Sequence, residues 1–465
     1  MFFSRILGVS TLALALAPGV RAQCEVQKLT ASDGAAYDGF SAGVLWGDID
    51  TIVAETVAIS GDTILVGAPW HDEVGVASGA AYVFRRSGGS WVQEAKLVPG
   101  DAAAGDSFGF CVALDGRTAA IGAPFDQDAG PQTGAVYVFK RKANGWVQAA
   151  KLTASDATQY DWFGNFVEVS GDRVLVGAMM HNELGQNSGV AYVFEDSPNG
   201  WVETAKLVPS DGALGDQFGV EGGLSGDFAV VGAWHDGDAG FNSGAAYVFE
   251  RKANGWQQVD KLIPGDASPN DRLGSSVDLQ DDRVLLGARF DDHSGTGFGV
   301  AYLFQRTPNG WVEEAQLTPS DGESGDFFGV AVALTDGRAL VGASRRKEAD
   351  YWSGSAYLFE EMESGWVETK KLVPGDGALG DFFGMSVAIV SGTAVVGSPG
   401  DDDLGDESGS AYLFHVANAI GDNYCGPANL NSTGMSAEVS ALGSSIVACN
   451  LLSLVATDLP PNQFG

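Results

Sequence analysis

The chain has 465 residues, of which 45% are hydrophobic, 18% are charged and 65 are glycine, and its net charge is −34. Glycine at about twice its usual share, together with so many apolar residues, is typical of short strands joined by tight turns and excludes a disordered chain. The negative charge argues against binding to nucleic acid, whose phosphates would be repelled, and against electrostatic docking on anionic membranes.

Residues 1–22 are predicted to form a secretory signal peptide. Arg5 supplies a positive flank, residues 6–17 form an apolar stretch, and Val20-Arg21-Ala22 matches a small-residue cleavage pattern. About a dozen apolar residues is too short a stretch to span a bilayer, and no later segment is long and apolar enough. We therefore expect an exported protein, secreted or at the cell surface, with no transmembrane segment.

Two triplets recur seven times along the chain at a spacing of 55 residues. The Tyr-hydrophobic-Phe triplet begins at Tyr82, Tyr137, Tyr192, Tyr247, Tyr302, Tyr357 and Tyr412. The glycine of a Gly-Ala-Pro-like triplet falls at Gly67, Gly122, Gly177, Gly232, Gly287, Gly342 and Gly397. A period of this length predicts units that cannot bury their own apolar face and must pack on their neighbours.

Each unit contains four short β-rich runs. In the second copy they are Phe108–Leu114, Thr118–Ala123, Gly134–Arg141 and Trp146–Thr153, which we call strands A to D. Turns rich in Gly, Asn and Asp separate them, as in an antiparallel meander. A solenoid of stacked coils would need parallel strands and shorter repeats. Seven meanders arranged radially make a seven-bladed β-propeller.

The count of strands predicts how the ring closes. D strands that open with Trp end at six leucines, and after Tyr412-Leu413-Phe414 no such strand follows. The segment Val26–Thr30 has the sequence of the missing strand, so the N-terminal strand should complete the seventh blade and remove its open edge. The predicted fold class is all-β, a monomeric propeller of four-stranded antiparallel blades over residues 23–417.

The repeat resembles a known family. Phe108-Gly109 with Gly122-Ala123-Pro124 is similar to the FG-GAP signature of integrin α-subunit propellers and of many secreted bacterial proteins. The resemblance covers roughly residues 25 to 416 and implies the propeller fold. It does not imply one function, because the fold hosts adhesion proteins, enzymes and scaffolds. Integrin-like calcium loops lie between strands A and B, where this chain has only short turns such as Ser60-Gly61-Asp62.

Calcium candidates lie instead on one predicted face of the ring. The B–C and D–A connections emerge together, and we call this side the loop face. Its B–C loops are acidic, whereas the opposite side carries basic turns such as Lys140-Arg141-Lys142. Carboxylate oxygens are the ligands of Ca²⁺. The predicted metal-binding residues are Asp126, Asp128, Asp236, Asp238, Asp291, Asp292, Asp401, Asp402, Asp403 and Asp406.

Every D–A connection also holds two aspartates. The pairs are Asp33/Asp38, Asp101/Asp106, Asp156/Asp161, Asp211/Asp216, Asp266/Asp271, Asp321/Asp326 and Asp376/Asp381. They could form a ring of calcium ligands, or each aspartate could accept backbone N–H bonds and fix the loop between blades. We favour the structural interpretation because the pair recurs whatever else the loop contains.

The sixth B–C loop breaks the acidic pattern. Arg345, Arg346, Tyr351 and Trp352 place cations beside aromatic rings, a combination typical of recognition sites. The alternative is that the basic residues pair with the neighbouring acidic loops.

From residue 418 the period stops. Residues 418–465 are predicted to be a linker followed by the start of a small β module that is cut short at the end of the sequence. Cys425 and Cys449 are candidates for a disulfide bond in an exported protein, whereas Cys111 occupies a strand position and is predicted to be an unpaired thiol.

The chain is not expected to be an enzyme. Its five histidines are scattered, and no Ser-His-Asp set, zinc-ligand spacing or phosphate-binding loop can be assembled. The leading hypothesis is a binding or adhesion module that contacts an extracellular protein or glycan through its loop face, with possible assistance from calcium. The alternatives are an extracellular hydrolase that uses loop-face carboxylates and a purely structural envelope protein.

Overall fold

The computed structural model describes residues 21–22, 25–42, 54–292, 295–416, 439–441 and 454–456. The chain divides into two compact units, Gln23–Pro427 and the combination of Met1–Ala22 with Ala428–Gly465. The predicted signal sequence up to Val20 and both cysteines of the predicted disulfide bond, Cys425 and Cys449, lie outside the described residues. In the part that the structure describes, no helix is long and apolar enough to cross a membrane.

In the smaller unit three short strands are described. They are β1 (Arg21–Ala22), β30 (Val439–Ala441) and β31 (Leu454–Ala456). The last two pair antiparallel, with Ser440 opposite Val455.

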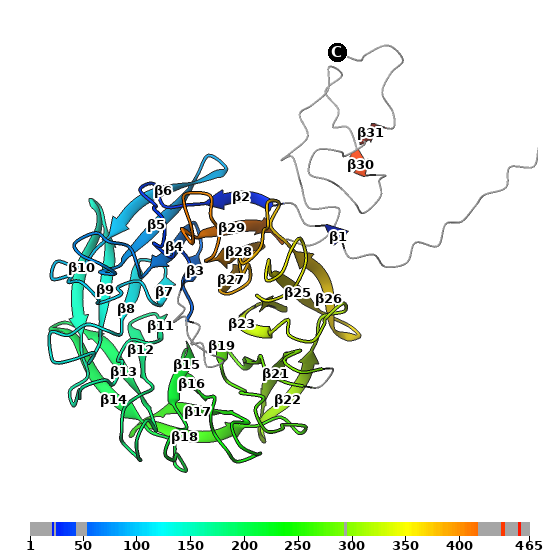
Figure 1. Ribbon diagram of the computed structural model, residues 1–465. Helices are drawn as coiled ribbons and strands as arrows, with labels where there is room; N and C mark the ends of the chain where they lie inside the picture. Colours follow the sequence, from blue (N-terminus) through cyan, green and yellow to red (C-terminus); the bar gives the residue numbers. More distant parts are fainter. Residues whose placement is uncertain are drawn as a thin grey trace, which may run out of the picture. The chain divides into compact units, whose positions relative to one another are not determined.

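The larger unit is a ring of seven four-stranded antiparallel blades, as predicted (Figure 1). In each blade the strands follow one another from the centre of the ring outward. The first three blades consist of β3 (Val57–Ser60), β4 (Thr63–Ala68), β5 (Ala80–Ser87) and β6 (Ser90–Leu97); β7 (Val112–Asp115), β8 (Thr118–Ala123), β9 (Ala135–Lys142) and β10 (Gly145–Leu152); and β11 (Val167–Ser170), β12 (Arg173–Ala178), β13 (Val190–Ser197) and β14 (Gly200–Leu207).

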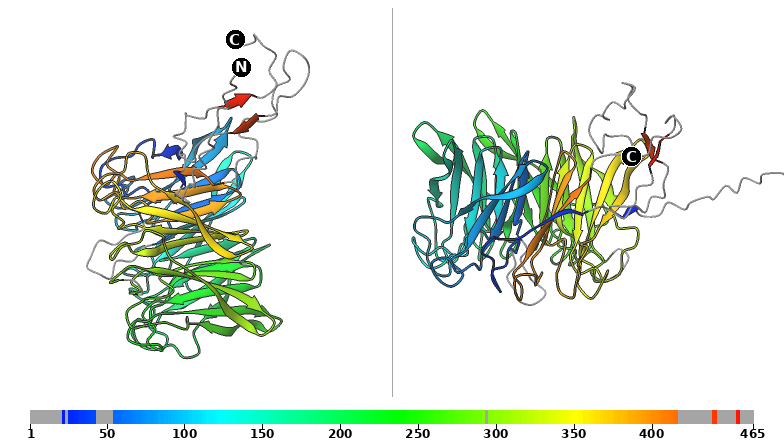
Figure 2. Two further views of the ribbon diagram at one scale, coloured as in Figure 1. Left: turned by 90° about the vertical axis from the view of Figure 1, so that its right-hand side faces the viewer. Right: turned by 90° about the horizontal axis from the view of Figure 1, so that it is seen from above.

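The next three blades repeat the arrangement. They consist of β15 (Phe218–Ser225), β16 (Phe228–Ala233), β17 (Ala245–Lys252) and β18 (Gly255–Leu262); β19 (Ser276–Gln280), β20 (Arg283–Ala288), β21 (Val300–Thr307) and β22 (Gly310–Leu317); and β23 (Phe328–Thr335), β24 (Arg338–Ala343), β25 (Ser355–Met362) and β26 (Gly365–Leu372). The loops that join the strands emerge at two opposite faces of the ring (Figure 2).

The seventh blade joins the two ends of the ring. Its inner strands are β27 (Val387–Val390), β28 (Thr393–Ser398) and β29 (Ser410–His415), and its outer strand is β2 (Glu25–Leu29). β2 pairs antiparallel with β29, with Lys28 opposite Tyr412. This confirms the prediction that the N-terminal strand closes the last blade.

Consecutive blades touch through their backbones where each third strand begins. Gly79, just before β5, forms a bridge to Phe108 of the next blade, and Phe108 N–H donates to Ser78 C=O at 3.1 Å. A Cβ at Gly79 would lie 2.0 Å from the Phe108 carbonyl oxygen, and Gly79 has a positive φ of 85°. Only glycine fits both requirements. The same bridge occurs at Gly134, Gly189, Gly244 and Gly354.

In the second blade the Phe-Gly pair belongs to this contact rather than to a strand, whereas β15 and β23 begin at the Phe of the pair. The sequence predicts strand A of the second blade from Phe108, but β7 begins at Val112 because the preceding residues form a turn and the bridge. The Phe108 ring packs edge-on against Tyr137 and Phe139, at centroid distances of 5.5 and 6.1 Å. All three rings are buried. The residues that recur most strictly therefore form the hydrophobic core between blades.

Candidate functional site

A lysine ammonium lies among carboxylates at the loop face of the second blade. Lys151 of β10 places its Nζ 2.9 Å from Asp101, 2.9 Å from Asp126 and 2.6 Å from Asp128. The Tyr137 ring lies beneath the ammonium at 5.1 Å, and its hydroxyl donates to Asp126 at 2.8 Å. We call this arrangement a lysine station. It joins strand D, the B–C loop and the D–A loop through one cation.

The station recurs in five more blades. The lysines are Lys96, Lys206, Lys261, Lys371 and Lys28, the last on the N-terminal strand. Lys28 contacts Asp376, Asp401 and Asp403 at 2.9, 2.7 and 2.5 Å. The strand that closes the ring therefore also brings the cation for the seventh blade.

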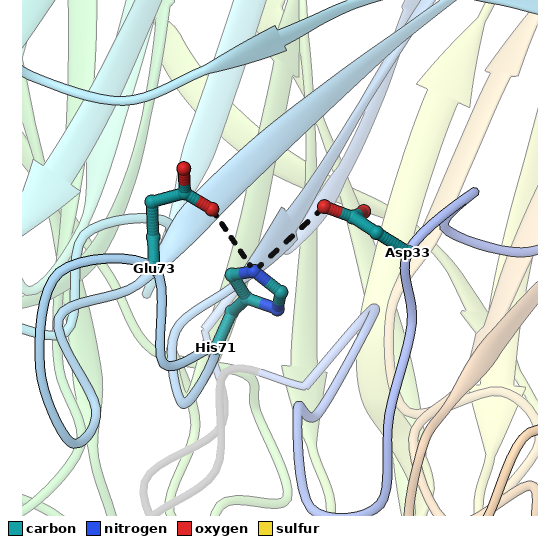
Figure 3. Close-up of side chains that lie close together, drawn as sticks. All are labelled: Asp33, His71 and Glu73. Atoms are coloured by element: carbon teal, nitrogen blue, oxygen red, sulfur yellow. Dashed lines mark ion pairs between the residues drawn. The ribbon is translucent and has the colours of Figure 1, made fainter.

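Among the described residues, three stations contain donor sets that could hold a metal ion. They are Asp33/His71/Glu73, Asp156/His181/Glu183 and Asp376/Asp401/Asp403, each with ligand atoms within 4.8 Å of one another. Figure 3 shows the first set, in which carboxylates of Asp33 and Glu73 face Nε2 of His71 at 4.0 and 3.4 Å. The Lys96 ammonium lies 2.7 Å from Asp33 and also contacts Glu73. A metal ion would have to displace this ammonium.

The fifth blade departs from the pattern. Gln316 stands where the other six blades have lysine, and its amide donates to Asp266 at 3.2 Å and to the Tyr302 hydroxyl at 3.3 Å. Tyr302 in turn donates to Asp291 at 2.8 Å. Among the described residues, this station therefore has the neutral amide of Gln316 where the others have a lysine ammonium.

The second aspartate of each D–A pair fixes its own loop. Asp106 accepts the backbone N–H of Ala103 at 2.7 Å, and Asp38, Asp161, Asp216, Asp271, Asp326 and Asp381 each accept from the residue three positions earlier. These bonds agree with the structural interpretation of the pairs. Burial raises the pKa of Asp106 to about 6 and that of Asp271 to about 7.

The first aspartate of the pair behaves in the opposite way. Burial would raise the pKa of Asp33, but the hydrogen bonds from Lys96 and Tyr82 together with the charge of Lys96 outweigh burial and hold the pKa below its usual value. The same balance lowers the pKa of Asp101, Asp156, Asp211, Asp321 and Asp376. In the pairs Asp101/Asp106, Asp211/Asp216 and Asp376/Asp381, the pKa of the first aspartate is thus lowered and that of the second is raised, because the lysine contacts the first and burial dominates at the second.

The ten predicted metal-binding residues divide into two groups. Six of them line lysine stations: Asp126, Asp128, Asp236, Asp238, Asp401 and Asp403. Three of the others accept protein donors: Asp291 from Tyr302, Asp292 from the Gly297 N–H at 2.8 Å and Asp402 from the Glu407 N–H at 2.7 Å. Asp406 accepts the Tyr37 hydroxyl at 3.2 Å. Their role as metal ligands stays a prediction.

The four predicted residues of the sixth B–C loop have different environments. Arg346 is 8% exposed and takes part in the station, 3.1 Å from Asp326 and 3.0 Å from Glu348. Tyr351 and Trp352 are 61% and 47% exposed. The Arg345 guanidinium lies over the Trp352 ring at 5.7 Å. The structure therefore brings Arg345 and Trp352 together and places Arg346 in the network below them.

Four carboxyl groups at or beside the inner strands were missed by the sequence reasoning; Glu221 is buried and the other three are half-buried. They are Glu55 just before β3, Glu168 on β11, Glu221 on β15 and Asp278 on β19. Burial, followed by repulsion from the other carboxylates, raises the pKa of Glu55 and Glu221 well above the usual value and that of Glu168 to about 8. Glu168 and Asp278 occupy a repeat position that holds alanine or glycine in the other five blades, and this departure from the repeat could have identified them in the sequence.

The lysine stations can be tested by removing the cation. Lys151→Met keeps the apolar stem but leaves Asp126, which is 2% exposed, without its ammonium. We expect a loss of about 2 kcal/mol or more in the free energy of unfolding, because a buried carboxylate loses its partner. The matched control is Lys142→Met, an exposed lysine at the end of β9. Gln316→Lys should raise the melting temperature by supplying the seventh cation. Equal stabilities of Lys151→Met and wild type in urea denaturation would contradict the role assigned to the ammonium.

Stability should increase as the pH falls from 8 to about 5. The folded-state pKa values of Asp106, Asp271 and Glu168 exceed the unfolded values of about 4, so the folded chain binds protons first and is stabilised as they bind. His71, whose pKa is raised by the Asp38 carboxylate 2.9 Å from its Nδ1, acts in the same direction. Asp33, with its lowered pKa, contributes stability that is lost only below about pH 4.

The measurement is the melting temperature from pH 3 to 9 at constant ionic strength. The control is Asp271→Asn, which should reduce the slope between pH 5 and 8. A maximum at pH 8 would contradict these assignments.

Comparisons with known proteins agree with this architecture. No curated protein matches the chain. Among solved structures it is similar to Saccharomyces cerevisiae Sqt1, with 8% identity and a TM-score of 0.43 over 85% of this chain and 100% of that one. At this identity and TM-score, the similarity supports no conclusion about family or function. The model of the FG-GAP repeat matches seven segments: residues 54–84, 91–139, 146–194, 201–249, 256–304, 311–359 and 366–414. The seven matched segments and the seven blades together show that the chain belongs to the FG-GAP repeat family.

Proposed function

We propose that this chain is an exported, non-catalytic propeller that binds a protein or a glycan through its loop face. Export rests on the signal-like N-terminal sequence and on the resemblance to secreted members of the family. The binding role rests on the side chains that the loop face exposes. The two parts of the proposal are independent, so either can fail alone.

Exposed aromatic side chains carry the proposal. Among the described residues, the large aromatic side chains that are strongly exposed are Tyr37, Tyr160, Phe241, Tyr351 and Trp352, at 58%, 57%, 75%, 61% and 47%. All five belong to D–A or B–C connections and therefore to the loop face. Burial of exposed aromatic rings by a partner contributes strongly to the free energy of binding, and aromatic residues are enriched at interfaces. The opposite face offers no comparable set among the described residues.

The carboxylates of the loop face are poorly suited to catalysis. A hydrolase needs one carboxyl group that is free to give a proton and another that is free to attack or activate water. At the stations, the first aspartates are held by lysine and the second by backbone N–H groups. These contacts stabilise the loops and leave the carboxylates engaged.

A cleft away from the loop face holds a second set of carboxylates that a hydrolase could use. A cleft of about 480 Å³ lies between the outer strands of blades four and five, and it is lined by Phe228, Arg306 and Trp311 together with Glu250 and Asp260. Both carboxylates have partners: Glu250 lies 3.3 Å from Lys252, and Asp260 accepts the Trp311 N–H at 3.0 Å. The cleft therefore favours binding of a ligand over its hydrolysis.

A ligand screen separates these functions. The full-length mature protein should bind members of a glycan array or of a displayed peptide library, and it should release no product from chromogenic glycosidase substrates. A Phe241→Ala, Tyr351→Ala double variant should lose affinity at least for some of those ligands, whereas Val147→Ala on an outer strand should not. Turnover would refute the non-catalytic assignment. Absence of any ligand would favour the structural envelope protein.

Calcium enters the proposal through the lysine stations. Ca²⁺ takes six to eight oxygen ligands, and the set Asp376/Asp401/Asp403 could supply part of that shell once the ammonium of Lys28 is gone. We infer that lysine takes the place of an ion in the wild-type chain.

The melting temperature of the wild type should therefore change little with calcium or with chelator. Lys28→Gln should be less stable and should regain stability when calcium is added, with magnesium as the control cation. A calcium-dependent shift in the wild type would reveal an ion site that lysine does not fill.

A further inference from the structure

The Arg345 guanidinium is held by aromatic rings and not by carboxylates. Its central carbon lies 4.2 Å from the centre of the Phe327 ring and 5.7 Å from that of Trp352. It makes no ion pair or side-chain hydrogen bond with any residue that the structure describes. The adjacent Arg346, by contrast, has four carboxylates within 4 Å. In a chain with 60 acidic residues, this half-buried guanidinium keeps N–H donors that no described carboxylate occupies, so an external anion can pair with it.

The rings fix the guanidinium before any ligand arrives. Trp352 stacks on Phe382 with centroids 5.8 Å apart and an interplanar angle of 20°, and Phe327 packs against Phe290 at 4.7 Å. Because these contacts restrict the side chain, binding costs little further conformational entropy. Arginine keeps its charge and presents its N–H donors in one plane, which suits a carboxylate bound by two parallel hydrogen bonds. The site is therefore shaped for a carboxylate.

The aromatic rings favour a protein over a sugar. The Lys347 ammonium lies 4.0 Å above the Tyr351 ring, and Trp352 already contacts Phe382 and Arg345. A sugar that stacks on an aromatic platform needs an open ring face, whereas a protein interface can cover exposed ring edges. Arg, Tyr and Trp are also the residue types that carry most of the binding energy at protein interfaces.

The charges around Arg345 determine which charges a partner should carry. Around the cationic residues Arg345 and Lys347, the loop face is acidic, with exposed side chains such as Glu323 at 71% and Asp321 at 41%. A polyanion would be repelled by this rim, but one carboxylate on an otherwise basic surface would match both the centre and the rim. We propose that Arg345, Lys347, Tyr351 and Trp352 form a docking site for a protein segment that presents an Asp or Glu side chain flanked by Lys or Arg. This proposal rests on the binding function proposed above.

The test uses a library of random peptides displayed on phage. Selection on the full-length protein, with counter-selection on Arg345→Ala, should enrich peptides that contain an acidic residue next to basic ones. Affinity for the synthetic peptides should fall at least tenfold in Arg345→Ala and in Trp352→Ala, and it should fall as salt is added. Arg345→Lys, which keeps the charge but loses the planar fork, should be intermediate and serves if the alanine variant is unstable.

The matched control is Arg283→Ala. Its guanidinium also lies over a ring, Trp366 at 5.7 Å, but on the opposite side of the ring of blades, where Glu314 and Glu361 are 3.1 and 2.7 Å away. Binding should be unchanged in this variant.

Several outcomes would overturn the proposal. Enriched peptides without an acidic residue would do so, as would equal affinities for wild type and Arg345→Ala. Binding of uronic-acid or neutral glycans that is lost in Arg345→Ala would assign the patch to sugars. If ligands bind the loop face elsewhere, only the docking site is refuted. If no peptide or glycan binds at all, the proposed binding function fails with it.

Discussion

The ring depends on one backbone contact that is repeated between consecutive blades. Where the third strand of a blade begins, a glycine approaches the carbonyl group of the Phe-Gly pair that follows, so closely that any side chain would collide with it. The contact sets the distance and the angle from one blade to the next. The aromatic rings then fill the space that this geometry leaves, with Phe108 between Tyr137 and Phe139 as the pattern. The Phe-Gly motif that identifies the family is therefore also the motif that forms the contact between blades.

Electrostatics has a second structural role in this chain. A net charge of −34 would oppose compaction if the carboxylates were merely distributed over the surface. The stations instead gather acidic side chains around lysines on the outer strands. Attraction to these lysines offsets part of the repulsion between carboxylates and holds the loops to the strands. Because the stations join the B–C loop to the D–A loop, they also keep the loop face in a fixed shape. A fixed face suits the presentation of exposed rings such as Phe241 and Trp352 to a partner.

The sequence was most informative where structure is periodic. The 55-residue repeat predicted the number of blades, the antiparallel meander and the closing role of Val26–Thr30, because each follows from contacts made identically in every copy. The stations were missed although their lysines recur with the same period, since a lysine on an outer strand reads as an ordinary solvated residue. The carboxyl groups of Glu55, Glu168, Glu221 and Asp278 could not be grouped from sequence, because they meet only where separate blades converge. Arg345 and Arg346 are neighbours in sequence, and only the fold reveals that the first lies against aromatic rings and the second among carboxylates.

The closure by β2 has a mechanical consequence. Glu25, at the start of β2, pairs with Phe414, near the end of β29, so the chain enters and leaves the ring at the same end of one strand pair. A force that pulls these two exits apart loads the ladder one hydrogen-bonded pair at a time, in the manner of a zipper rather than in shear. Opening would begin at Glu25 and Phe414, and it would then release Lys28 from Asp401 and open the seventh blade, while the six other blades keep all their strands. The β2–β29 strand pair that completes the ring is thus also the point at which tension would open it.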